Sequence, residues 1–204
     1  MNALLIAVVL ASGAAKFEGT AAPLDEALKA KVTGVSWKEG CPVPLAGLRL
    51  LKLKYWGFDG AVHDGQLLVN EAVVKDLLDI FEELFDAKFP IESMRLIDDF
   101  NASDDASMEA NNTTSFNCRP ITGQSKGFSK HSWGRAIDIN PKTNPYVSKS
   151  SVEPKSGSAY VDRTKTYQGG ITEGGVVFEA FKKRGWAWGG SWKSPKDFQH
   201  FEKK

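Results

Sequence analysis

The segment that decides the fold is SKHSWGRAIDIN, residues 129–140, which combines a strand pattern with a turn. Two isoleucines alternate with Asp138, so a strand here turns them toward a core and points Asp138 to its other face. His131 precedes Asp138 by an odd number of residues and would face the opposite way on an unbroken strand. Gly134 supplies a flexible point, and we therefore expect the chain to turn there and bring His131 back toward Asp138.

A second segment, SPKDFQHFE at residues 194–202, carries another carboxylate and another histidine. Ser194 followed by Pro195 is typical of the start of a helix, which predicts one short helical turn. Asp197 and His200 are three residues apart, so such a turn places both side chains on the same side. The two segments together predict a cluster of imidazoles and carboxylates.

The chemistry of this cluster indicates a metal site. Two imidazoles and one carboxylate, from His131, His200 and Asp138, make a three-ligand set for one Zn²⁺ ion and leave the fourth position to water. Zinc lowers the pKa of that water to about 7, and a carboxylate that is not a ligand then accepts its proton. Asp197 is placed for that role. The alternative is that each motif histidine is a structural residue with satisfied hydrogen bonds and that Asp197 is only a carboxylate at the start of a helix.

The third histidine, His63, lies in a turn-like segment and is interpreted as a surface residue.

Helices and strands are mixed along the rest of the chain without a β–α–β rhythm. This favours an α+β fold: a single domain with a small antiparallel sheet flanked by helices, with the zinc site at the sheet. The clearest element is a helix at residues 70–87, where apolar side chains recur at helical spacing after Asn70 as N-cap. The other expected elements are a helix at 24–32, a strand or hairpin at 48–58, a strand at 94–100, a loop at 101–114, a strand at 136–140, a helix at 176–183 and strands at 186–188 and 199–202.

Composition excludes several classes of function. The chain has 204 residues and a formal net charge of +1, with 42% hydrophobic and 25% charged residues, which fits one globular domain. Lysine and arginine are scattered rather than clustered, which argues against a nucleic-acid partner. A glycine-rich phosphate loop is also missing from the sequence, so nucleotide binding has no support. We expect a monomer.

The first residues predict export. Residues 3–15 carry no charge and end in small side chains, which is typical of a secretory signal peptide and too short for a membrane span. We therefore interpret residues 1–22 as signal peptide and leader, residues 23–204 as the domain, and the location as secreted or periplasmic. A buried N-terminal element of a cytosolic protein is the alternative. Export makes a disulfide between Cys41 and Cys118 chemically possible, and two buried thiols are the equal alternative.

Both motifs resemble a known family. Ser129-x-His131-x-x-Gly134-x-Ala136-x-Asp138 together with Asp197-x-x-His200-Phe201 is similar to the signature of the zinc-dependent D-alanyl-D-alanine peptidases of peptidase family M15. That group includes VanY-like carboxypeptidases and phage L-alanyl-D-glutamate endopeptidases. The resemblance to the VanY-like branch covers nearly the whole chain after the leader, including residues 40–44, 58–60, 89–91, 115–119, 140–146 and 185–192.

The resemblance implies roles for individual residues. His131, Asp138 and His200 would bind zinc, and Asp197 would be the general base where some members carry glutamate. Arg119 matches the arginine thought to stabilise the oxyanion, which agrees with the charge that develops on the carbonyl oxygen. The shorter aspartate leaves the carboxypeptidase or endopeptidase subtype open.

Other residues are candidates for contact with the substrate. Ser129 is a candidate for substrate contact; it could also hold its loop or the second nitrogen of a metal-bound histidine, or be an ordinary turn serine. Trp186, Trp188 and Trp192 either line a cleft for a peptide or sugar or belong to the core. A terminal carboxylate of the substrate needs a cationic partner. The candidates for this partner are Lys130, Arg135 and Arg163.

Two functions follow from these observations. The first is a zinc metallopeptidase that hydrolyses a peptide bond in peptidoglycan stem peptides, either D-Ala-D-Ala or an internal bond such as L-Ala-D-Glu. The second is a non-catalytic, zinc-stabilised module that binds the cell wall. A fourth protein ligand would indicate the second, and the candidates for it are Glu202 and His63.

Overall fold

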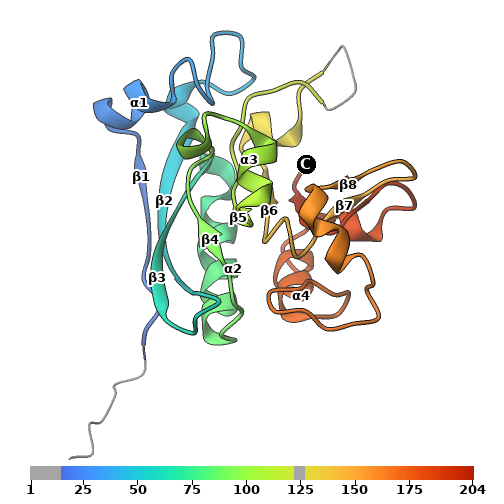
Figure 1. Cartoon of the computed structure of the whole chain (residues 1–204). Helices are drawn as coiled ribbons and strands as arrows, with labels where there is room; N and C mark the ends of the chain where they lie inside the picture. The colour runs from blue at the N-terminus through green and yellow to red at the C-terminus, as the bar shows by residue number, and fades with distance from the viewer. Residues whose placement is uncertain (1–14, 122–126) are drawn as a thin grey trace, which may run out of the picture.

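A computed structural model describes residues 15–121 and 127–204 (Figure 1). The helices are α1 (Glu26–Val32), α2 (Val74–Asp86), α3 (Asp104–Glu109) and α4 (Val176–Lys182). The strands are β1 (Gly19–Pro23), β2 (Leu48–Trp56), β3 (Val62–Asn70), β4 (Ser93–Met94), β5 (Asn112–Thr113), β6 (Ala136–Asp138), β7 (Tyr146–Val147), β8 (Val152–Glu153), β9 (Ala187–Trp188), β10 (Lys196–Asp197) and β11 (His200–Glu202). Short 3₁₀ helices are η1 (Leu45–Gly47), η2 (Glu71–Val73), η3 (Ile97–Phe100), η4 (Lys130–Trp133), η5 (Lys155–Tyr160) and η6 (Gly189–Ser191). The mixture confirms the predicted α+β class.

The N-terminal half is built around a long hairpin. Strands β2 and β3 pair antiparallel over their full length, and β1 adds to the free edge of β2 (Figure 1). Alternate hydrophobic side chains of the hairpin pack on the apolar face of α2, because strand side chains point to opposite faces at every second residue. Asn70 caps the helical segment by accepting a hydrogen bond from the Ala72 amide at 3.0 Å, so the predicted hairpin and long helix are both confirmed.

The N-terminal boundary of the folded part lies before residue 23. Strand β1 begins at Gly19 and is paired with β2, so part of the stretch assigned to the leader belongs to the sheet. Residues 1–14 of the predicted signal peptide lie outside the described residues, and cleavage stays a prediction. No helix among the described residues is long and apolar enough to cross a membrane.

The C-terminal half contains two small sheets. One has the order β6-β11-β9 and the other β10-β7-β8, and all their pairs are antiparallel. Helix α4 packs beside α2, which joins the two halves through one hydrophobic core (Figure 1). The strands expected near residues 136–140, 186–188 and 199–202 are present, slightly shortened.

Two expectations for the middle of the chain are wrong. The strand expected at 94–100 is mostly the 3₁₀ helix η3, because buried Asp98 accepts hydrogen bonds from the backbone and hydroxyl of Ser36 instead of alternating outward. The loop expected at 101–114 contains α3, whose N-cap Ser103 accepts from the Ala106 amide at 3.2 Å. An N-cap serine followed by acidic residues is a helix-start signal, but here it lies in a stretch rich in Asn, Ser and Asp that is also typical of a loop.

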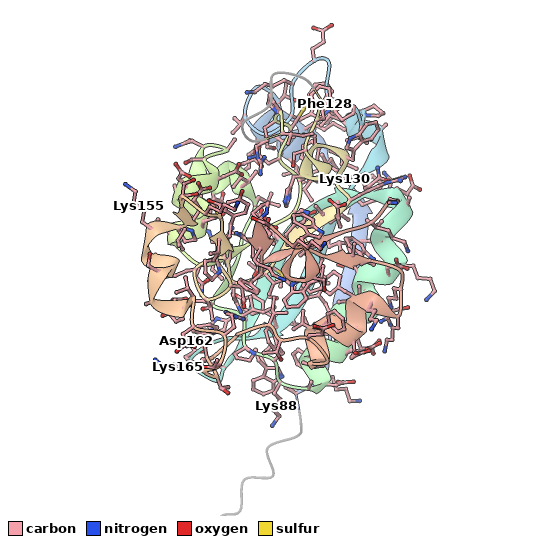
Figure 2. All side chains as sticks on the ribbon, turned by 90° about the vertical axis from the view of Figure 1, so that its right-hand side faces the viewer. Lys88, Phe128, Lys130, Lys155, Asp162 and Lys165 are labelled. Carbon is pink, nitrogen blue, oxygen red and sulfur yellow. A yellow bond between two sulfur atoms is a disulfide. The ribbon has the colours of Figure 1, made fainter. Side chains whose placement is uncertain are left out.

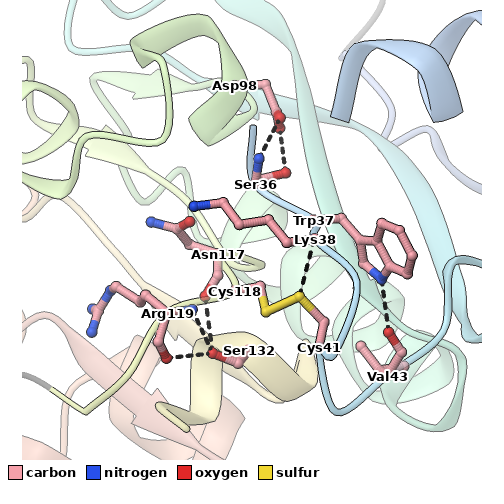
Figure 3. Close-up of a disulfide and its surroundings, with 10 residues drawn as sticks. All are labelled: Ser36, Trp37, Lys38, Cys41, Val43, Asp98, Asn117, Cys118, Arg119 and Ser132. Atoms are coloured by element: carbon pink, nitrogen blue, oxygen red, sulfur yellow. Dashed lines mark hydrogen bonds between the residues drawn. A yellow bond between two sulfur atoms is a disulfide. The ribbon is translucent and has the colours of Figure 1, made fainter. Parts of the chain in front are cut away.

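A disulfide joins Cys41 to Cys118 across 77 residues (Figure 3). Its Cα atoms are 6.0 Å apart, within the usual range for such bonds. The sulfurs adjoin a second hydrophobic cluster beneath α1. The pairing decides between the two alternatives that the sequence left open.

Candidate active site

His131 reaches Asp138 because the chain turns at Gly134. His131 lies on η4, and Gly134 follows it with a φ of +61°, in the left-handed region. A Cβ on Gly134 would lie 2.6 Å from the backbone nitrogen of Asn70, so glycine is required for space as well as for conformation. His131 Nε2 lies 3.1 Å from Asp138 Oδ2, which confirms the predicted turn.

The helical turn predicted for residues 194–200 is wrong. Asp197 lies on β10 and His200 on β11, and β10 pairs with β7 through Lys196 and Asp197. The Lys196 ammonium also donates to the Gly190 carbonyl at 2.9 Å. Cross-strand hydrogen bonds therefore outweigh the local helix-start signal, since propensity is a weak preference that tertiary contacts override.

Three side chains nevertheless converge as expected. His200 is the register partner of Asp138 on the neighbouring strand β6. His200 Nδ1 lies 2.9 Å from Asp138 Oδ1 and 3.3 Å from His131 Nε2. Ligand atoms around a tetrahedral zinc ion are separated by about 3.3 Å, given bonds of about 2.0–2.1 Å. The spacing of the two imidazole nitrogens and the Asp138 carboxylate therefore fits one zinc ion.

The remaining nitrogen of each imidazole is held by an acceptor. His131 Nδ1 donates to the Ser115 carbonyl at 2.5 Å, and His200 Nε2 lies 3.3 Å from the Glu202 carboxylate. A carbonyl only accepts, so the proton of His131 is on Nδ1 and the lone pair of Nε2 points at the cluster. Metal-binding histidines usually have such a partner for the second nitrogen. Both rings are therefore oriented as zinc ligands.

Charge also concentrates at this cluster. Burial opposes ionisation of Asp138, but the adjacent imidazoles of His131 and His200 outweigh it and hold the pKa of that carboxyl far below its usual range. Burial likewise disfavours a protonated His200, but hydrogen bonds to Asp138 and Glu202 raise its pKa to about 10. Asp138 thus stays ionised although it is buried, and in the absence of another cation the protonated imidazole of His200 balances its charge.

No fourth histidine, cysteine or carboxylate among the described residues joins the group formed by His131, Asp138 and His200. Glu202 approaches the nitrogen of His200 that faces away from the cluster. His63 is on the surface of β3, where it contacts Asp59 at 3.0 Å. Neither candidate is a fourth ligand, and the protein supplies three.

Asp197 lies beside the cluster without being part of it. Its Oδ1 atom is buried and accepts no hydrogen bond from a described residue. Burial raises its pKa to about 6, and the nearby charges of His200 and Asp138 act in opposite directions on it. A Cβ on Gly189 would lie 2.6 Å from the Asp197 carbonyl oxygen, so the absence of a side chain there allows η6 to pack directly against β10.

Arg119 is attached to η4 through its backbone, because its amide donates to the Ser132 hydroxyl at 2.8 Å. Its guanidinium Nε forms an ion pair with Asp104, and its positive charge is close enough to lower the pKa of Asp197. The charge of Arg119 therefore lies near the site.

The three predicted substrate-contact residues all have structural partners. Trp186 and Trp188 are buried, with indole N–H groups that donate to Asp76 and to the Phe198 carbonyl, so both pack in the core. Their contact with substrate stays a prediction. The Ser129 hydroxyl accepts from the His131 amide at 3.3 Å and caps η4. The tryptophan nearest the cluster is Trp192, whose ring centroid is 5.7 Å from that of His200.

Two of the cationic candidates for contact with a substrate carboxylate, Arg163 and Lys130, have different surroundings. Arg163 donates to three backbone carbonyls and to Asn144, and its guanidinium lies over the Phe198 ring, so it stabilises a loop. Lys130 lies at the same end of the molecule as Phe128 (Figure 2), and its charge acts on Glu202. Lys130 is therefore better placed than Arg163 for a charged substrate group.

Sequence reasoning missed the partners of the ligands. Ser115 contributes a backbone carbonyl, which no side-chain pattern reveals. Glu202 was considered only as a ligand, although a residue two positions after His200 on a strand shares its face. Tyr146 belongs to the segment 140–146 that resembles the family, but the sequence assigns it no role. It is the register partner of Asp197, and burial together with the carboxylates of Asp197 and Glu153 raises the pKa of its phenol.

Among the described residues, three side chains could hold a metal ion beside a carboxylate outside the group, and this arrangement is the one found in catalytic metal centres. Residues 122–203, somewhat less than half of the chain, match the family model Peptidase_M15_4, described as D-alanyl-D-alanine carboxypeptidase. The match confirms the resemblance to peptidase family M15 and supports a peptidase. No curated protein and no solved structure matches the chain significantly.

Proposed function

We propose that the chain is a zinc metallopeptidase that hydrolyses a peptide bond in peptidoglycan stem peptides. The single observation that supports this best is the convergence of His131, Asp138 and His200 beside the buried carboxylate of Asp197. The family match agrees with a peptide substrate that ends in D-Ala-D-Ala. An internal bond such as L-Ala-D-Glu is the other candidate.

In this proposal His131, Asp138 and His200 hold the ion. Bound Zn²⁺ would supply an activated water and a Lewis acid for the scissile carbonyl. Asp197 accepts a proton at its unpartnered Oδ1 and returns it to the leaving nitrogen, which requires the ionised carboxylate at the start of each turnover. Arg119 stabilises the negative charge that develops on the carbonyl oxygen.

We also propose that the protein acts outside the cytoplasm, after export by the N-terminal signal. The disulfide between Cys41 and Cys118 supports this location, since such bonds persist in oxidising compartments. A substrate in the cell wall is found in the same place.

The test is a digest of purified muropeptides by the zinc-loaded protein, followed by mass analysis. We expect loss of one alanine from pentapeptides for a carboxypeptidase, or separation at L-Ala-D-Glu for an endopeptidase. A chelator should stop the reaction and added zinc should restore it. Asp197→Asn is the matched control, because it should keep zinc and give no product.

The non-catalytic wall-binding module predicts a different outcome. It would sediment with purified cell walls and release no product that a chelator prevents. That result, with zinc bound and no muropeptide cleaved, would contradict the peptidase. The three-ligand set favours the enzyme, because structural zinc sites are usually closed by a fourth protein ligand.

A further inference from the structure

The backbone of Arg119 is fastened directly to the turn that carries a metal ligand. The Ser132 hydroxyl accepts from the Arg119 amide at 2.8 Å and lies 2.8 Å from the Arg119 carbonyl oxygen (Figure 3). Ser132 follows His131 in η4. The preceding residue, Cys118, is held by the disulfide and by the Ser36 carbonyl. The starting point of the Arg119 side chain is therefore fixed relative to the metal group.

The far end of the same side chain is held by helix α3. Arg119 Nε forms an ion pair with Asp104 Oδ2, and Asn117 Nδ2 donates to Asp104 Oδ1 at 2.9 Å. One carboxylate thus contacts two residues of the segment that leads to Arg119. Asp104 and Arg119 are each about one-third exposed or less, at 32% and 27% of the side chain, so water screens this pair only in part.

An arginine side chain loses rotamer entropy when it is ordered, and a guanidinium stabilises a developing charge best when it is already in place. The ion pair with Asp104 restrains the position of the guanidinium. The charge of Arg119 acts on Asp197 from this position. We propose that Asp104 is a positioning residue, which orients Arg119 toward the substrate carbonyl. This inference rests on the proposed peptidase function.

The chain offers a matched control for Asp104 in the next residue. Asp104 and Asp105 both lie in the first turn of α3, where both interact favourably with the helix dipole, but Asp105 is exposed and the observed ion pair with Arg119 is made by Asp104. Asp104→Asn and Asp105→Asn therefore change the same charge on the same helix. Only the first breaks the ion pair.

The experiment measures kcat and KM of both zinc-loaded variants, alone and combined with Arg119→Ala. We expect Asp104→Asn to lower kcat by about 10-fold to 100-fold, since misplacement by about 1 Å can cost 10²-fold, with KM, zinc content and Tm nearly unchanged. Asp105→Asn should stay within about twofold of the parent. In the Arg119→Ala background, Asp104→Asn should have no further effect on kcat.

A second readout does not depend on activity. The Nε–Hε cross-peak of Arg119 in the ¹⁵N NMR spectrum of the metal-free protein should be sharp in the parent and in Asp105→Asn, and shifted or broadened in Asp104→Asn. If Asp104→Asn fails to fold, Asp104→Glu keeps the charge, displaces it by one methylene and should still lower kcat at an unchanged Tm.

Several outcomes would overturn the inference. An equal loss of kcat from Asp104→Asn with and without Arg119 would mean that Asp104 acts through the fold alone. Unchanged kcat in Asp104→Asn beside an inactive Arg119→Ala would mean that the arginine needs no partner. Failure of every muropeptide to react would instead remove the proposed function, while the NMR result would still decide whether Asp104 orients Arg119.

Discussion

The C-terminal part of the chain, residues 127–204, and the N-terminal part, residues 15–121, contribute different things to one site. The C-terminal part carries all three proposed ligands and the candidate base, and it contains nearly all of the family match. The N-terminal part supplies Arg119 with its partner Asp104, and the Ser115 carbonyl that orients His131. The comparison teaches that the proposed ligands and the Glu202 partner of His200 lie within the matched segment, whereas the partner of His131 and the proposed transition-state cation lie outside it.

The largest effect is expected from a ligand. His131→Ala should abolish zinc binding and reduce hydrolysis by about 10³-fold or more, because Lewis-acid catalysis contributes several kcal/mol and each 1.4 kcal/mol is tenfold. Zinc content by elemental analysis and muropeptide turnover measure this. His63→Ala, which changes a surface histidine paired with Asp59, should change neither. Full zinc content in His131→Ala would break the assignment of the site to the C-terminal part.

The candidate base should separate activity from metal binding. Asp197→Asn should keep zinc and lower kcat by about 10² to 10⁴-fold, the usual contribution of a positioned acid–base group. The variant removes a negative charge from a buried site without changing its shape. Near-normal turnover would mean that the proton is taken by another group.

Glu202→Gln tests the orientation of His200 from within the C-terminal part. The hydrogen bond to His200 Nε2 loses its anionic acceptor, and we expect about 10-fold to 100-fold weaker zinc binding, as for other such partners. Competition against a coloured chelator measures the Kd. Glu173→Gln, at an exposed position, is the control. Equal affinity in both variants would show that Glu202 does not tune the ligand.

The pH dependence sharpens the role of Asp197. Burial raises its pKa to about 6, and the positive charge of a bound metal lowers it. Because the base works only when ionised, kcat/KM should fall tenfold per pH unit on the acid side of a pKa at or below about 6. A profile measured from pH 4 to 8 at constant zinc occupancy checks this. An acid limb that begins above pH 7 would assign the titration to a different group.

The smallest effect on zinc binding and turnover is expected from removal of the disulfide in the N-terminal part. Replacing Cys41 and Cys118 together by serine should lower the free energy of unfolding by about 2–4 kcal/mol, since the bond closes a long loop. Zinc content should be unchanged. Urea unfolding of the variant and of the reduced parent measures the difference. Loss of zinc from the folded variant would mean that the two parts are less separate than proposed.

The sequence predicts those features that depend on local periodicity or on a single special residue. Alternation around Asp138, the turn at Gly134 and the cap at Asn70 are of this kind, and all three are present. The turn expected at Asp197 is absent because pairing with β7 decides its conformation. The Ser115 carbonyl belongs to the backbone, so no side-chain pattern in the sequence reveals its contact with His131. A tryptophan such as Trp186 gives the same sequence pattern whether it lines a cleft or packs in a core. Long-range contacts decide these cases.

The close approach at Gly134 connects the ligand turn to the N-terminal half. The Asn70 amide donates to the Gly134 carbonyl at 2.9 Å, and the Asn70 side chain donates to the Trp133 carbonyl at 3.0 Å while it caps the helical segment that leads into α2. Asn70 therefore joins the turn that follows His131 to the helical segment that leads into α2. Because a metal that binds only the folded state stabilises everything folded with its site, the free energy of zinc binding is shared with the hairpin and α2. If zinc binding and the folding of α2 are coupled in this way, the protection of the α2 amides from hydrogen exchange should rise with zinc occupancy, although none of the proposed ligands lies on that helix.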